Sequence, residues 1–94
     1  MISTKIVCQD KYEAQKIASL IFVKEGMETF ITEILNVFGN EVVISIKDKS
    51  AHSVLFKDKS QVDTFIDFIQ SVVEKKHKIL DTITNENTVE IIKE

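Results

Sequence analysis

The sequence predicts an α+β fold, a two-layer sandwich in which helices pack on one face of an antiparallel sheet. Residues 41–57 alternate apolar and polar side chains on both sides of a short polar turn, which indicates two adjacent strands. Residues 60–80 then carry apolar side chains at helical spacing behind a capping residue. The tetrapeptide Lys-Asp-Lys-Ser occurs at 47–50 and again at 57–60, and we expect a hairpin turn at the first copy and a helix start at the second.

The amino-terminal segment predicts a strand followed by a helix. Residues 5–8 form a short β-branched run that is typical of a strand. Asp10 then offers a helix N-cap, and Glu13 lies at the capping-box spacing. Apolar residues follow at helical intervals as far as Gly26, a residue suited to the left-handed position that ends a helix.

Residues 27–38 are compatible with either a helix or a strand. Their apolar side chains fall on one helical face, but most of the residue types favour strands. The dipeptide Gly39-Asn40 would join a strand here to the next one through a two-residue hairpin. A strand gives the order βαβββα, which we prefer. A helix, together with a paired strand at residues 88–92, leads to a ferredoxin-like βαββαβ arrangement instead.

The carboxy-terminal half predicts one long helix and a short remainder. Ser60 is the expected N-cap, with Asp63 at the capping-box position, and the apolar stripe runs on to Leu80. We therefore expect this helix to end between residues 81 and 85. The chain then divides into a single α+β domain over residues 1–84 and a tail or edge strand over residues 85–94.

Composition restricts the classes of function. The 94 residues carry a net charge of −3, and all twelve basic residues are lysine. Without arginine the chain lacks the planar fork that reads guanine and phosphate in bidentate fashion, so nucleic acid is an unlikely partner. A single cysteine excludes an intrachain disulfide and fits a reducing cytoplasm. The sequence contains no apolar run long enough for a transmembrane helix, and we expect no membrane association.

No residue pattern predicts catalysis, a cofactor or a metal site. Cys8, His52 and His77 are far apart in the sequence, and neither a Cys-x-x-Cys motif nor a glycine-rich phosphate loop is present. Asp63 and Asp67 fall on the solvent side of the expected helix, where hydration explains them. We therefore expect a protein without enzymatic activity.

Surplus apolar surface is the remaining functional signal. In the strand interpretation of 27–38, the hairpin places Ile34 and Phe38 with Val43 on the sheet face opposite the helices, with Leu55 nearby. Monomers rarely leave such a face open to water. The predicted interface consists of Phe30, Ile34, Phe38, Val43 and Leu55. We expect a small non-catalytic regulator, adaptor or inhibitor that binds a partner protein and self-associates as a homodimer.

The alternative function uses a basic cluster. Lys75, Lys76 and Lys78 flank His77 late in the predicted helix, where they could bind a nucleic acid or a phosphorylated ligand. Lysines at a helix carboxy-terminus also stabilise the helix dipole, and this structural role is the simpler explanation.

Overall fold

The computed structural model describes residues 1–21 and 29–94. Two helices and six strands lie within these ranges. In chain order they are β1 (Ile2–Val7), α1 (Lys11–Ile21), β2 (Ile31–Phe38), β3 (Glu41–Ile46), β4 (Ala51–Leu55), α2 (Lys59–Lys75), β5 (Ile79–Asn85) and β6 (Thr88–Lys93). No helix in the described ranges has the length and apolar character needed to cross a membrane.

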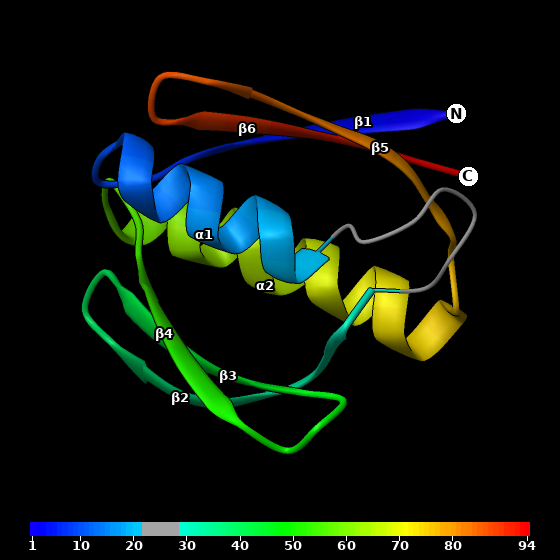
Figure 1. Ribbon diagram of the computed structural model, residues 1–94, viewed down its shortest axis with the longest axis horizontal. Helices are drawn as coiled ribbons and strands as arrows, with labels where there is room; N and C mark the ends of the chain where they lie inside the picture. The colour runs from blue at the N-terminus through cyan, green and yellow to red at the C-terminus, as the bar shows by residue number, and fades with distance from the viewer. Residues whose placement is uncertain (22–28) are drawn as a thin grey trace.

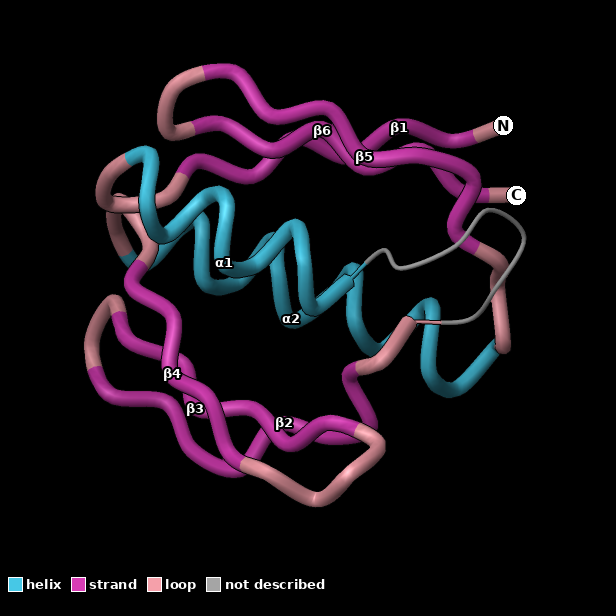
Figure 2. The backbone as a smooth tube through the Cα atoms, in the orientation of Figure 1, coloured by secondary structure: helices cyan, strands magenta, loops and turns pink. Residues whose placement is uncertain are grey.

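The strands form two antiparallel sheets with the helices between them. One sheet has the order β1-β6-β5 and the other the order β2-β3-β4. Figures 1 and 2 show α1 and α2 lying between the two sheets, so that each sheet has one face against the helices. The α+β class and the antiparallel pairing are confirmed. The expected topology is not, because the strands form two sheets rather than one.

The chain consists of two consecutive strand–helix–hairpin units, over residues 2–46 and 51–93, called here the first and second halves. Each half gives its first strand to the other half's hairpin, because β1 pairs with β6 and β4 pairs with β3. The buried residues of the two helices correspond at a constant spacing. In α1 they are Ala14, Ile17, Leu20 and Ile21, and their counterparts in α2 are Val62, Phe65, Phe68 and Ile69. The same stripe of side chains therefore builds both sides of the core.

The two halves meet at equivalent positions. Cys8 and Phe56, each just after the first strand of its half, form an isolated antiparallel bridge. The amide of Cys8 donates to the carbonyl of Asn87 (2.7 Å), and the Asn87 side chain donates back to the Cys8 carbonyl (3.0 Å). In the same way, the amide of Phe56 donates to the carbonyl of Asn40, and the Asn40 side chain donates to the Phe56 carbonyl, each at 2.8 Å. The turn of each hairpin is thus fixed to the end of the exchanged strand.

Both helices begin at an aspartate. The Asp10 carboxylate accepts the amide of Glu13 (2.9 Å), as the sequence predicts for the N-cap of α1. In α2 the cap is Asp58, which accepts the amide of Gln61 (3.2 Å). The expected cap, Ser60, lies inside the helix and donates its hydroxyl to Asp58 (2.7 Å). Aspartate satisfies the same free amides as serine and lies two residues earlier, so the helix begins there.

The repeated tetrapeptide serves the two local roles that the sequence predicts. In the turn between β3 and β4, Asp48 accepts both the amide (2.8 Å) and the hydroxyl (2.5 Å) of Ser50. Asp58 and Ser60 form the equivalent hydroxyl bond at the start of α2. These bonds are the first cause of the lowered pKa of each aspartate.

The end of α2 differs from the expectation. The helix stops at Lys75, because Lys76 adopts a left-handed conformation (φ 56°). Ile79, which falls within the helix that the sequence predicts, is fully buried as the first residue of β5. A buried position fits both patterns, so periodicity alone cannot show that the chain has changed from helix to strand.

The last ten residues also differ from the expectation of a tail or edge strand. Thr88–Lys93 forms β6, the central strand of its sheet. Val89 and Ile91 are fully buried against the helices. A short alternating strand can occupy an edge or a central position in a sheet. Here β6 is central because it pairs with β5 on one side and with β1 on the other.

Candidate protein-binding face

The side of the β2-β3-β4 sheet away from the helices, called here the outer face, carries three of the five predicted interface residues. Phe38 and Leu55 both pair with Glu41, so one cross-strand row contains Phe38, Glu41 and Leu55, with Glu41 in the middle. Val43 lies in the next row along β3. Phe38 is 72% exposed, whereas Val43 and Leu55 are half-buried. An exposed aromatic ring on a sheet face that also carries shorter apolar side chains is a typical anchor for a protein partner.

The other two predicted interface residues do not lie on the outer face. Ile34 pairs with the fully buried Ile44 and packs against the core from the inner side of the sheet. A bulge at Leu35 inserts one extra residue, which reverses the alternation on its amino-terminal side and leaves Leu35 50% exposed. Phe30 precedes β2 and is half-buried. Strict alternation could not have revealed this bulge.

The outer face is acidic as well as apolar. By register its charged members are Glu33 and Glu41, and no lysine lies in its paired rows. The corresponding face of the other sheet mixes both signs, with Lys5 directly opposite Glu90. Glu90 also accepts the Ser3 hydroxyl at 2.6 Å. The two sheets therefore present different surfaces to solvent.

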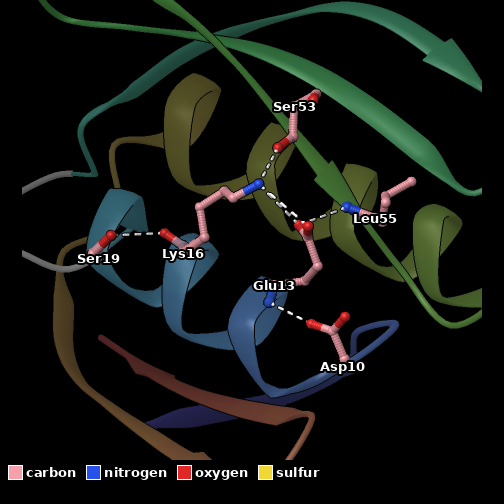
Figure 3. A network of polar contacts seen from close by, with 6 residues as sticks. All are labelled: Asp10, Glu13, Lys16, Ser19, Ser53 and Leu55. Carbon is pink, nitrogen blue, oxygen red and sulfur yellow. Dashed lines mark hydrogen bonds and ion pairs between the residues drawn. The ribbon is translucent and has the colours of Figure 1, made fainter.

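Side chains of α1 cover the free edge of β4, as Figure 3 shows. The Glu13 carboxylate accepts the amide of Leu55 (3.1 Å), and the Lys16 ammonium donates to the carbonyl of Ser53 (3.1 Å). Glu13 and Lys16 also form an ion pair at 3.2 Å. Glu13 thus uses its carboxylate on β4 rather than on a capping box. Because these backbone groups are satisfied, strand addition at β4 is disfavoured and the face itself stays available.

The cysteine is placed for packing and not for nucleophilic attack. Cys8 has no exposed surface. Burial, followed by the charges of Glu13 and Asp10, raises the pKa of its thiol to about 12. The thiolate is the nucleophilic form, and this environment suppresses it. His52 instead bonds the Ser50 hydroxyl (2.9 Å). Within residues 1–21 and 29–94, no group of three His, Cys, Asp or Glu side chains could hold a metal ion.

The basic cluster lies at the carboxy-terminal end of α2. Lys75, Lys76 and Lys78 are all exposed, with Lys75 in the last turn and Lys78 in the loop before β5. None of them makes an ion pair with a described residue. Asp63 and Asp67 are exposed as expected, and Asp63 lies 3.7 Å from the Lys59 ammonium.

Comparison of the chain with protein-family models, curated proteins and solved structures finds no match. The duplication is visible in the sequence as Gln9-Asp10-Lys11 against Lys57-Asp58-Lys59, each followed by the same apolar spacing. The Lys-Asp-Lys-Ser repeat at ten residues has more identical positions than this longer duplication, so it is the more visible signal in the sequence.

Proposed function

We propose that this chain is a non-catalytic protein-binding module, a regulator, adaptor or inhibitor that docks its partner on the outer face of β2-β3-β4. The observation that carries the proposal is the row in which the exposed Phe38 ring and Leu55 lie on the two sides of Glu41, with Val43 in the next row. Burial of such side chains contributes about 25 cal/mol per Å². The proposed setting is the cytoplasm, where an unpaired cysteine such as Cys8 stays reduced.

The size of the face favours weak, reversible binding. Three strands spaced about 4.8 Å apart and roughly 20 Å long present roughly 300 Å² of flat area. Each partner in a stable complex contributes about 800 Å². Contacts around Leu35 would extend the surface, but a transient complex is the expected outcome.

Self-association is one form of this proposal. In a two-fold dimer through the outer face, the Glu41 side chains would approach each other beside the Phe38 rings. Their repulsion weakens the dimer at low salt, so added salt should strengthen it. A contact made by the exposed lysines with an anionic partner would respond in the opposite direction.

The test is sedimentation equilibrium of the wild-type chain up to about 1 mM, an upper range chosen for weak complexes. We expect a concentration-dependent dimer that Phe38→Asp abolishes. The matched control is Ile83→Asp, which places the same charge on the outer face of the other sheet, where Ile83 is 47% exposed. A monomeric wild type at every concentration, or equal loss of the dimer in both variants, would remove self-association from the proposal.

The basic cluster supports a second candidate function, binding of a nucleic acid or a phosphorylated ligand. Its supporting observation is that Lys75, Lys76 and Lys78 are exposed without ion-pair partners among the described residues. A gel-shift titration at low salt tests it, with retardation expected to fall steeply as salt is raised. Replacing these lysines with glutamine should remove the shift, whereas the same change at Lys47, Lys49 and Lys57 should not. Absence of retardation by the wild type rejects this function.

A further inference from the structure

A cleft of about 270 Å³ lies between β2 and α2, on the inner side of the bulged strand. Its apolar part consists of Ile34 from β2 with Ile69 and Val73 from α2. Ile69 is almost fully buried, while Ile34 and Val73 are half-buried and pack against the core. The volume is below the range typical of small-molecule sites and suits one inserted side chain.

The rim of the cleft is acidic. Glu33 from β2 and Glu74 from α2 line it from its two sides, and Gln70 lines it one helical turn before Glu74. Both glutamates are exposed and neither forms an ion pair with a described residue. Among the residues that the structure describes, no lysine lines the cleft. The charge of this rim is therefore left for a cationic partner to balance.

The neighbouring strand edge is poorly suited to strand addition. Among the described strands β2 pairs with β3 alone, so its other edge has no strand partner within residues 1–21 and 29–94. Two register shifts interrupt it, one between Ile31 and Glu33 and one between Ile34 and Asn36. Bulged edges do not offer the regular ladder that an added strand requires. Recognition here must depend on a side chain inserted into the cleft and on charges around it.

We propose that the cleft between β2 and α2 binds a segment of a partner protein in which one aliphatic side chain is flanked by lysine or arginine. The aliphatic side chain packs on Ile34, Ile69 and Val73, and the flanking cations lie against Glu33 and Glu74. The apolar part of the cleft is distinct from the outer face, because Ile34 and Phe38 lie on opposite sides of the sheet, whereas Glu33, on the edge strand β2, borders both surfaces. The inference extends the proposed protein-binding function to a second surface and can fail independently of it.

The experiment begins with selection of a displayed library of random 12-residue peptides on the immobilised wild-type chain. We expect enrichment of peptides that carry an aliphatic residue between basic residues. The enriched peptides are then synthesised with a fluorophore and titrated by fluorescence anisotropy at low salt. Neutralising the rim with Glu33→Gln and Glu74→Gln should weaken binding about fivefold to tenfold, the sum of two exposed ion pairs.

Matched variants separate the cleft from general electrostatics and from the outer face. Asp63→Asn with Glu94→Gln makes the same change in net charge at exposed positions outside the cleft, and should leave affinity unchanged. Gln70→Trp, at an exposed rim position, fills the mouth of the cleft without removing a core side chain and should lower affinity at least tenfold. Phe38→Asp should bind the peptides as the wild type does.

Four results would overturn the inference. They are no enrichment, enrichment of acidic or uncharged peptides, unchanged binding by Gln70→Trp, and loss of binding in Phe38→Asp alone. The last result would assign the peptides to the outer face and leave the proposed function standing. A wild-type dimer that Gln70→Trp abolishes would identify a second copy of the chain as the occupant, and would also reject the basic peptide.

Discussion

Residues 2–46 and 51–93 form the same strand–helix–hairpin unit, yet the side chains on the outer sides of their sheets differ. The first half supplies β2 and β3, and their face carries Phe38 and Val43 with acidic neighbours. The second half supplies β5 and β6, whose face places Glu90 opposite Lys5. The core stripe corresponds position by position, whereas the outer faces do not. A repeated scaffold thus leaves its solvent surfaces free to differ, because only the inner faces must fit the helices.

The halves also differ at one inner position. Ile46 and Lys93 each end the last strand of their half, opposite the first residue of the preceding strand. Lys93 is only 6% exposed. Its ammonium donates to the Ser71 hydroxyl and lies 5.7 Å from the Phe68 ring centroid. Burial, followed by the charge of Lys75, lowers the pKa of Lys93.

The strongest test of the correspondence removes one large core side chain from each half. Phe65→Ala should lower the free energy of unfolding by about 3–5 kcal/mol, and Ile17→Ala, at the corresponding position of α1, by about 2–4 kcal/mol. Both residues are fully buried. Phe65 should have the larger effect because its ring also packs on Phe56, with centroids 4.9 Å apart. Urea unfolding measures both. A small loss in either variant would show that one helix does not belong to the shared core.

Replacing Lys93 with methionine makes the second half resemble the first. We expect Lys93→Met to raise the free energy of unfolding by about 1 kcal/mol at pH 7, because it removes the charge of a largely buried side chain that has no carboxylate partner among the described residues. The folded lysine has a lowered pKa, so the unfolded chain binds more protons as the pH approaches 10.5. Wild-type stability therefore rises through that range relative to the variant.

The measurement is urea unfolding of both proteins between pH 7 and pH 10.5. The gap between them should close as the pH rises. Titration of Cys8 acts in the opposite direction, because its raised pKa withdraws stability above pH 9, but it is common to both proteins and cancels in the difference. A gap independent of pH would show that the amine is not destabilised by burial.

The turn amides test whether the junctions are equivalent. Asn40→Ala and Asn87→Ala each remove a side-chain donor to a carbonyl of the exchanged strand, at 2.8 Å and 3.0 Å. Each should cost about 1 kcal/mol by thermal or urea unfolding. The two losses should add in the double variant, since separate hairpins carry them. A loss confined to one variant would break the equivalence of the two turns.

Equal or smaller effects are expected from the turn residues before these asparagines. Gly39 and Glu86 both have positive φ angles, 59° and 55°. Gly39→Ala should cost about 1 kcal/mol through backbone strain alone, because a Cβ there would meet no atom within 4 Å. Glu86→Gly should stabilise the chain by a few tenths of a kcal/mol. A stabilising Gly39→Ala would contradict the left-handed turn.

Local patterns in the sequence determined the α+β class and the helix starts near Asp10 and Asp58. They also determined the strand before Gly39, the hairpin around it and the two strands that flank the first Lys-Asp-Lys-Ser. These features depend on alternation, capping and turn chemistry within a few residues. The same reasoning placed Phe38, Val43 and Leu55 on one face correctly, because that face needs only regular pairing around the hairpin.

Tertiary structure decided the rest. The exchange of β1 and β4, the central place of β6 and the end of α2 at Lys75 depend on which distant strand edge is free. The bulge that turns Ile34 inward and forms the cleft depends on fitting β2 against α2. A linear pattern records which residues are apolar, but the neighbour that covers each one is set by packing between segments far apart in the chain.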